Sequence, residues 1–244
     1  PYTSSTTKIL RDNFAQLRKQ IDKKNFLKKN DLIIDIGSND GNLLGNFKDK
    51  YKVLGVTPEN IGKIAIKKGI PTFIDYFDNS VVNKINKKYG KAKIITATNV
   101  FAHIDDINGS VEVVKKILLP DGVFVIEAPY LKNLLQGLEY DTIYHEHLTY
   151  LSIKPLRELF QKFDLEIFDV EFKDFHGGSI RVFVQHKNSC YEISNKILEI
   201  ERDEEMLNIH NINKLENFAK SVEEHKRKLI EILKDLKRNG KKIA

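Results

Sequence analysis

Short apolar runs alternate with segments of helical spacing through the first half of the chain. Five runs are typical of buried strands because they are short, apolar and bounded by turn residues. They occur in DLIIDIG, YKVLGVT, PTFIDYF, AKIITATNV and GVFVIEAP. Apolar residues recur at helical spacing in residues 8–30, before the first of these strands. The same spacing occurs between the strands, in IGKIAIKKG, VVNKINKKYG and residues 109–119. This order predicts an α/β fold, with a mostly parallel sheet that carries helices on both faces.

The pattern changes after Ser152. KPLRELFQKFDL predicts a helix that starts near Pro155, and EIFDVEFKDFHGGSIRVFVQH predicts two antiparallel strands around a Gly-Gly turn. The chain is highly charged from about residue 191 and carries a helical apolar stripe: Leu215, Phe218, Val222, Leu229, Ile232 and Leu236. We expect this helix to pack on its own domain, with a partner-binding helix as the alternative. The expected organisation is a domain of residues 1–190 and a helical extension of residues 191–244.

Composition narrows the classes of protein. Apolar residues make up 41% of the chain, enough for a sizeable core, and no apolar run reaches the roughly 18 residues that span a bilayer. The single cysteine, Cys190, cannot form an internal disulfide, which favours a cytoplasmic location. The net charge is +6, but the lysines are scattered among acids. Because clustered charge marks a nucleic-acid surface, we expect neither a nucleic-acid nor a membrane partner.

The turn after the first predicted strand is a candidate ligand site. DIGSNDG places Asp35 at the strand end and spaces the glycines as G-x-x-x-G, unlike a dinucleotide motif or a P-loop. Glycines let a backbone approach a ligand, and ligands of open α/β sheets bind at this edge. An acid there suits a ligand with an amino-acid portion, such as S-adenosylmethionine. A purely structural turn is the alternative.

With the following strands in order, the turn predicts a Rossmann-like, class I methyltransferase domain that binds S-adenosylmethionine. Thr57 stands where such domains usually carry an acid for the ribose hydroxyls, although a threonine can still form a hydrogen bond. The expected cofactor contacts are Asp35, Gly37, Ser38, Asn39, Asp40, Gly41, Thr57 and Asn99.

The stretch YDTIYHEHLTYLS concentrates titratable side chains in residues 140–152. It is compatible with a metal site, an acid–base site or a crowded surface turn. The His-x-His spacing of His145 and His147 could place two imidazoles together, with Glu146 as a third ligand. Neither an HExxH helix nor a cysteine cluster accompanies them, so no metal is predicted.

Five segments occur in the same order as in the sugar C-methyltransferases: PYTSSTTK, DIGSNDGNLL, TATNVFAHI, YDTIYHEHLTYLS and FHGGSIRVFV. The chain resembles that family over nearly its whole length. The glycine turn is generic, whereas the Tyr-His-Glu-His block followed by His-Gly-Gly-Ser-Ile-Arg is specific. The resemblance implies S-adenosylmethionine as cofactor and methyl transfer to a carbon of a nucleotide-linked 4-keto deoxysugar.

The chain also departs from the family pattern. Typical members begin with a small cysteine-rich zinc-binding domain and end with another Rossmann-like domain. Here the zinc-binding cysteines are missing, and the chain ends at NGKKIA, which looks like the opening of that last domain's first strand. We expect a central fragment of a longer protein or a naturally reduced member.

The resemblance also assigns roles within the block. His147 would be the base that removes a proton beside the ketone, since the ordinary pKa of histidine lies near neutral pH. Glu146 and Tyr144 would bind the sugar or orient groups around the resulting enolate. His145 would be a further polar contact or a structural residue. An O- or N-methyltransferase and a catalytically inactive scaffold domain are the alternative functions.

Four more residues are candidates for substrate contacts: His103, His176, Arg181 and Tyr2. His103 could contact the sugar, act as a second base or be a helix-cap or core histidine. Arg181 suits phosphate or sugar oxygens, or is a surface charge. Tyr2 lies in a segment that reaches the active site in the family. His186, His210 and His225 lie outside any motif and are expected to be structural or surface residues: none belongs to the predicted site.

Overall fold

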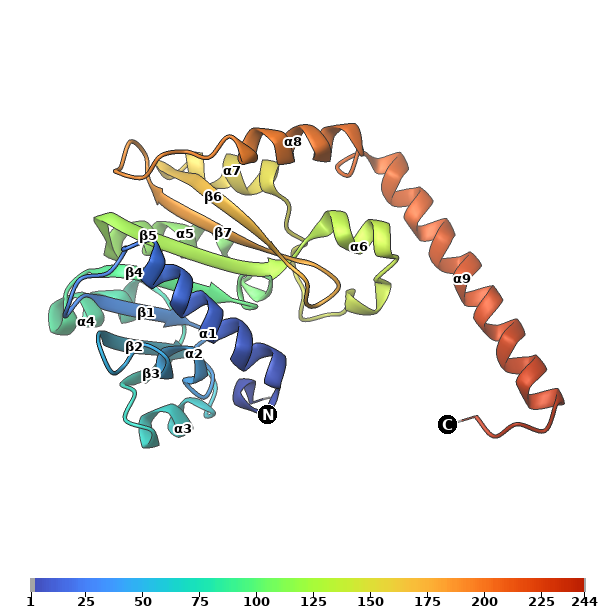
Figure 1. Ribbon diagram of the computed structural model, residues 1–244, viewed down its shortest axis with the longest axis horizontal. Helices are drawn as coiled ribbons and strands as arrows, with labels where there is room; N and C mark the ends of the chain where they lie inside the picture. The colour runs from blue at the N-terminus through green and yellow to red at the C-terminus, as the bar shows by residue number, and fades with distance from the viewer. Residues whose placement is uncertain (1–2, 244) are drawn as a thin grey trace.

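The computed structural model describes residues 3–243, which fold around one seven-stranded sheet (Figure 1). The strand order is β3-β2-β1-β4-β5-β7-β6: the first five strands run parallel, and β7 and β6 are added antiparallel. The predicted mostly parallel sheet and the predicted antiparallel pair are both confirmed. The strands are β1 (Leu32–Ile36), β2 (Lys52–Thr57), β3 (Thr72–Ile74), β4 (Ala92–Thr98), β5 (Leu118–Pro129), β6 (Leu165–Lys173) and β7 (Ser179–His186).

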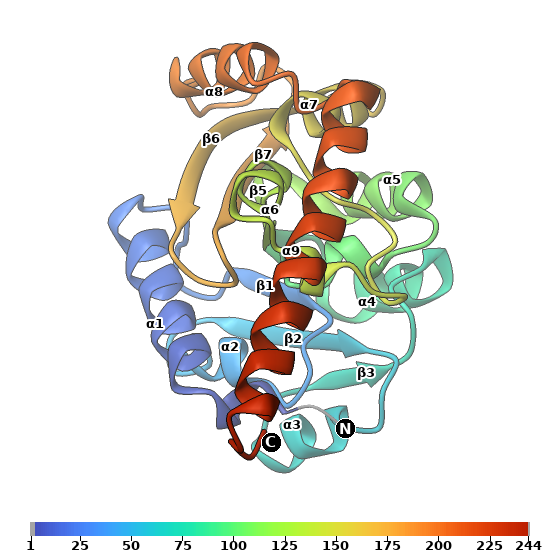
Figure 2. The same ribbon diagram turned by 90° about the vertical axis from the view of Figure 1, so that its right-hand side faces the viewer.

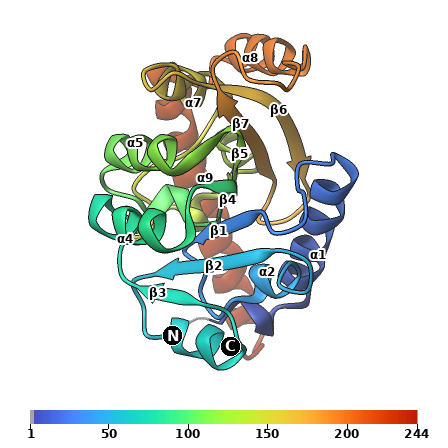
Figure 3. The ribbon, with the colours of Figure 1, turned by 90° about the vertical axis from the view of Figure 1, so that its left-hand side faces the viewer.

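Helices cover both faces of the sheet, as predicted. Figure 3 shows α1 and α2 on one side, and α4 and α5 on the other. The α-helices are α1 (Lys8–Lys23), α2 (Asn42–Gly45), α3 (Gly62–Lys67), α4 (Asn79–Tyr89), α5 (Ile107–Ile117), α6 (Leu131–Gly137), α7 (Ile153–Gln161), α8 (Lys196–Met206) and α9 (Ile212–Arg238). Three short 3-10 helices are η1 (Ser4–Thr6), η2 (Phe101–His103) and η3 (Tyr140–Thr142).

The apolar runs form strands because both faces of the sheet are buried. Along β1, successive side chains enter different cores: Ile33 packs with Leu43 of α2, whereas Ile34 packs with Val111 of α5. This alternation follows from the two-residue period of a strand. A continuous apolar run therefore supplies both layers of the core at once.

The ends of several elements differ from their predicted places. The first helix ends at Lys23 and does not reach residue 30, because Asn25 adopts a left-handed φ of 53°. The helix after Ser152 begins at Ile153, so Pro155 lies in its first turn, where a missing N–H breaks no helical bond. Neither α6 nor α8 was predicted as a separate helix.

The long helix α9 stands apart from the sheet (Figure 1), and in the turned view it passes in front of β1 and β2 (Figure 2). The prediction that its apolar stripe packs on its own domain is wrong in this structure, because α9 contains no buried residue. Its hydrogen bond to the domain joins His225 Nδ1 and the Tyr140 hydroxyl, at 3.0 Å. Within residues 3–243, no helix is both long and apolar enough to cross a membrane.

A buried ion pair joins the first helix to the sheet. Arg181 on β7 and Glu127 on β5 are both fully buried, and Arg181 Nε donates to Glu127 Oε2 at 2.7 Å. Arg181 also donates to Asn13 Oδ1 at 2.7 Å and to the Gln20 side chain, both on α1. Asn13 Nδ2 in turn donates to Glu127 Oε1 at 2.6 Å. Each charge is therefore neutralised and hydrogen-bonded, as a buried ion pair requires.

Replacing Glu127 with alanine would leave the Arg181 guanidinium buried without its counter-charge. We expect Glu127→Ala to lower the free energy of unfolding by roughly 3–5 kcal/mol, measured by urea denaturation. Asp12→Ala is the control, since it breaks the exposed Lys8–Asp12 pair and should barely change stability. Equal losses in the two variants would contradict the structural importance of the buried pair.

Candidate active site

The turn between β1 and α2 lies at the carboxyl edge of the parallel strands. Asp35 is the second-last residue of β1 and lies opposite Thr96 on β4. The backbone amides of Gly37 and Ser38 donate to the Val56 carbonyl on β2, at 2.8 and 3.1 Å. The predicted turn is thus held between the two strands that flank β1.

The Asp35 carboxyl is almost completely buried, with 3% exposure. Burial raises the pKa of Asp35 to about 7, although the Thr96 hydroxyl, which donates to Oδ1 at 2.6 Å, favours the charged form. A cationic group bound beside Asp35 would therefore lower its pKa and favour the charged carboxylate.

Two glycines in the turn take left-handed backbone angles, with φ of 70° at Gly37 and 78° at Gly41. A Cβ on Gly37 would lie 2.7 Å from Val100 Cγ2, and one on Gly41 would lie 2.7 Å from Ile70 Cδ1. Because such contacts are too close, both positions require glycine. The G-x-x-x-G spacing is explained by packing as well as by access for a ligand.

The N-terminal segment is fastened to the same turn. The Ser4 amide donates to Asn39 Oδ1 at 3.0 Å, and the Ser4 hydroxyl donates to Asp40 Oδ1 at 2.7 Å. Burial alone would raise the pKa of Asp40, but hydrogen bonds from Lys68 and the neighbouring serines lower it below its ordinary value. The buried carboxylate thus stays charged. Tyr2, a predicted substrate contact, lies outside the described residues.

Thr57 and Asn99 lie on either side of the turn. Thr57 is the last residue of β2, and its side chain is buried. Its methyl group packs closely against Gly62, since a Cβ added to Gly62 would lie 2.8 Å from Thr57 Cγ2. Asn99 follows β4 with a left-handed φ of 54°, and its amide donates to the Glu127 carbonyl at 2.7 Å. Both residues therefore stand at the strand ends where the sequence places them.

Buried polar atoms without a hydrogen-bond partner surround this turn: Ser38 Oγ, Asn42 Nδ2 and Asn99 Oδ1. A buried polar atom without a partner costs free energy, so such atoms indicate a ligand or water. Together with the buried Asp35, they fit a ligand rich in amine and hydroxyl groups. Asn42 was not among the predicted residues, although it directly follows Gly41 in the motif.

Residues 138–152, which we call the histidine loop, carry the second part of the site between α6 and α7. The amides of Leu148 and Thr149 donate to the Ala102 carbonyl, at 2.9 and 3.3 Å. Ala102 belongs to η2, the short helix that follows β4 and ends at His103. These two hydrogen bonds therefore bring the histidine loop against the end of β4. Strand β4 is the neighbour of β1, the strand that leads into the glycine turn.

Hydrogen bonds select the tautomer of the His147 imidazole. Its Nδ1 lies 2.8 Å from the Thr142 carbonyl, which can only accept, so Nδ1 carries the proton. Nε2 is then the basic atom, and it receives the Tyr144 hydroxyl at 3.1 Å. Partial burial, and then the charge of Glu146, raise the pKa of Tyr144, so the phenol keeps its proton and donates. His147 is arranged as a base at Nε2.

His103 lies directly against His147, with ring centroids 4.9 Å apart. Burial lowers the pKa of His103, and the positive charge that His147 can carry lowers it further. The structure thus brings His103, Tyr144 and His147 together, and Tyr150 joins them with its ring centroid 6.2 Å from that of His147.

The predicted contacts His145 and Glu146 are exposed neighbours of this group. His176 lies on the β6–β7 turn with a φ of 51°, and burial lowers its pKa. The His176 ring lies against Phe175, with ring centroids 5.4 Å apart. Gly177 and Gly178 follow His176 with positive φ angles of 71° and 122°, which favour glycine at both positions.

The expected substrate contact of Arg181 is corrected by the structure. The Arg181 guanidinium is fully buried and bound to Glu127, Asn13 and Gln20, so it presents no group to a ligand. Among residues 3–243, no group of three histidine, cysteine or acidic side chains is placed to hold a metal ion.

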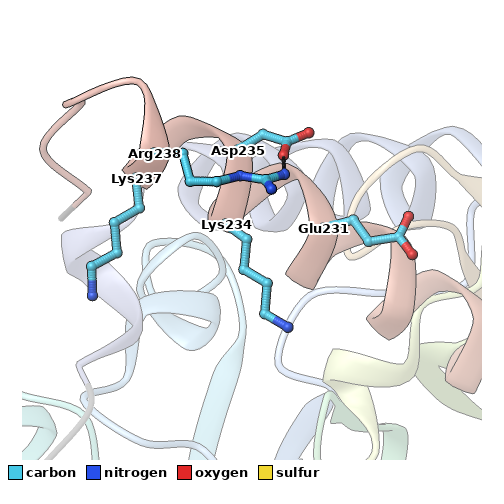
Figure 4. A pocket seen from close by; sticks show the side chains of 5 residues that line it. All are labelled: Glu231, Lys234, Asp235, Lys237 and Arg238. Atoms are coloured by element: carbon cyan, nitrogen blue, oxygen red, sulfur yellow. Dashed lines mark hydrogen bonds and ion pairs between the residues drawn. The ribbon is translucent and has the colours of Figure 1, made fainter.

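A surface hollow on α9 is separate from this site (Figure 4). It is lined by Glu231, Lys234, Asp235, Lys237 and Arg238, all from the last turns of that helix. All five lining residues are exposed and charged, so the hollow lacks the hydrophobic and aromatic residues that usually line a small-molecule site.

The buried Asp35 should make stability depend on pH. Its pKa is higher in the folded chain than in the unfolded one, so the free energy of unfolding falls as pH rises from about 4 to 7. Asp35→Asn removes this titration and should be the more stable protein at pH 8, by roughly 4 kcal/mol, with little difference at pH 4. The measurement is urea unfolding of both proteins at several pH values. Parallel pH curves would disprove the raised pKa.

Two family models together cover most of the chain. A model described as a methyltransferase domain matches residues 7–170, and one described as a C-methyltransferase C-terminal domain matches residues 174–244. The chain is 33% identical to C-methyltransferase NovU of Streptomyces niveus over 216 residues. The aligned region covers 88% of this chain and 51% of that protein. The chain therefore spans about half the length of this curated relative.

Solved structures share the fold at low sequence identity. An S-adenosylmethionine-dependent methyltransferase from Clostridium acetobutylicum has a TM-score of 0.57 at 16% identity, covering 73% of this chain and 92% of that one. Magnesium protoporphyrin IX methyltransferase from Synechocystis, solved with bound SAH, has a TM-score of 0.54 at 11% identity, covering 72% and 83%. The first family model matches more than half of the chain, and this confirms the predicted kinship: the chain belongs to the methyltransferase-domain family and, by its second family match, is related to the C-methyltransferases.

Proposed function

We propose that this chain is the catalytic part of an S-adenosylmethionine-dependent C-methyltransferase that acts on a nucleotide-linked 4-keto deoxysugar. The observation that carries the proposal is His147, whose Nδ1 proton is committed to the Thr142 carbonyl while Nε2 stays basic. Carbon methylation of a keto sugar needs such a base beside the methyl donor. A cytoplasmic location is part of the same proposal.

The residues around the glycine turn suit the cofactor. When bound, S-adenosylmethionine supplies an electrophilic methyl group on a positively charged sulfur. Asp35 would accept hydrogen bonds from the amino-acid portion, and Asn99 Oδ1 and Asn42 Nδ2 would gain the partners that they lack. Thr57 would replace the usual acid at the ribose with a single hydroxyl.

His147 would act on the substrate rather than on the cofactor. Its Nε2 takes the proton beside the ketone, and the positive charge that results is stabilised through Nδ1 by the Thr142 carbonyl. The Tyr144 hydroxyl, released from Nε2, is free to donate to the developing enolate oxygen. Tyr144 can make this move because it is 43% exposed.

The cofactor assignment is tested by calorimetric titration of the chain with S-adenosylhomocysteine. We expect micromolar binding that Asp35→Ala loses, because the buried acid would accept hydrogen bonds from the amino-acid portion. Asp31→Ala, just before the other end of β1, is the matched control and should bind normally. Absence of binding by the unaltered chain would favour the inactive scaffold domain instead.

The base assignment is tested by solvent deuterium entering a nucleoside-diphosphate 4-keto-6-deoxyhexose in the absence of methyl donor. His147→Ala should slow this exchange by roughly a hundredfold or more while leaving S-adenosylhomocysteine binding intact. His186→Ala is the control, since His186 lies near Leu118, at the start of β5 and the opposite edge of the sheet. Wild-type exchange by His147→Ala would rule out this base, and no exchange by the unaltered chain would favour O- or N-methylation.

A further inference from the structure

The histidine loop and α6 form one excursion from the sheet, residues 131–152, whose two ends lie side by side. Tyr130, directly after β5, forms a parallel bridge with Leu151. The Leu131 amide donates to the Leu151 carbonyl at 2.9 Å. Figure 1 shows the excursion beyond the end of β5, on the side of the sheet that faces α9. A contact that holds the junction of Tyr130 and Leu151 therefore sets where the excursion begins and where it ends.

Glu204 of α8 binds both ends of the excursion. Its side chain is fully buried, and Oε1 accepts the Tyr130 hydroxyl at 2.8 Å and the Ile153 amide at 2.7 Å. Oε2 accepts the Lys154 amide at 3.1 Å. One carboxylate thus joins the end of β5 to the first turn of α7, where a negative charge is also favoured by the helix dipole.

The residue expected to cap α7 does not do so. Ser152 is the N-cap residue, a position at which a serine hydroxyl usually accepts an amide of the first turn. Here Ser152 makes no side-chain cap bond, and its hydroxyl instead lies 2.8 Å from His210 Nε2. The start of α7 depends on a carboxylate supplied from 51 residues further along the chain.

We propose that Glu204 is a positioning residue for His147 and Tyr144. Two of the contacts that hold the histidine loop are the Ala102 carbonyl, which accepts the Leu148 and Thr149 amides, and the Glu204 carboxylate at the base of the loop. Reaction rates fall steeply when a catalytic group is displaced by about 1 Å, so both contacts matter for the geometry of the base. The role in catalysis rests on the proposed function, whereas the control of the His147 geometry does not.

The decisive measurement is the NMR signal of the His147 Nδ1 proton in histidine-labelled chain, identified by its loss in His147→Ala. In the unaltered chain this proton is held by the Thr142 carbonyl and should exchange slowly with water. Glu204→Ala should accelerate its exchange by about tenfold or more, with S-adenosylhomocysteine affinity unchanged. The matched control is Glu205→Ala, which removes an exposed ion pair between the same two helices.

An unchanged Nδ1 signal in folded Glu204→Ala would overturn the proposal. If that variant fails to fold, Tyr130→Phe removes one of the three bonds to Glu204 and should give a smaller acceleration. Equal exchange in Tyr130→Phe and the unaltered chain would then overturn it. The NMR measurement does not depend on methyl transfer. It therefore still tests the role of Glu204 if His147→Ala retains deuterium exchange and the base assignment fails. If both proposals hold, Glu204→Ala also lowers kcat for the keto-sugar probe while KM for S-adenosylmethionine stays the same.

Discussion

The buried pair of Arg181 and Glu127 is the interaction on which the rest of the structure depends. It joins β5, the last parallel strand, to β7, the first antiparallel one, and its remaining hydrogen bonds hold α1 against the sheet. The same Glu127 receives the Asn99 amide on its carbonyl. A charge pair sealed from water tolerates little displacement, because each ion keeps its desolvation penalty if the other moves. Both halves of the site are therefore built on strand ends that this pair fixes.

Backbone carbonyls, more than side chains, give the candidate base its properties. The Thr142 carbonyl decides which nitrogen of His147 holds the proton, and the Ala102 carbonyl holds the histidine loop against η2. A carbonyl can only accept a hydrogen bond, so it selects the tautomer of the neutral imidazole that carries its proton on Nδ1. This arrangement keeps His147 Nε2 basic and leaves the phenol of Tyr144 as the mobile partner.

The sequence predicts what depends on local pattern and misses what depends on distant partners. The strands were predictable because fully buried strands are continuous apolar runs, and the glycine turn because its positive φ angles require glycine. The burial of Arg181 was not predictable, since Asn13 and Gln20 lie more than 150 residues away along the chain. The apolar stripe of α9 indicates a helix correctly but cannot say what covers it. The role of His147 came from the resemblance, and periodicity alone would not have separated it from His145.

The first family match ends within β6 and the second begins directly after this strand, yet the sheet continues across that point. Strand β7 lies in the C-terminal match, but it is hydrogen-bonded to β5 and β6 and supplies Arg181 to the core. Helix α8 lies in the same match and supplies Glu204 to the base of the histidine loop. A boundary at residue 190 would likewise separate the buried Ile197 and Ile200 from the core that they complete. Helix α8 therefore packs as part of the core beneath the sheet and supplies a buried carboxylate to the base of the histidine loop.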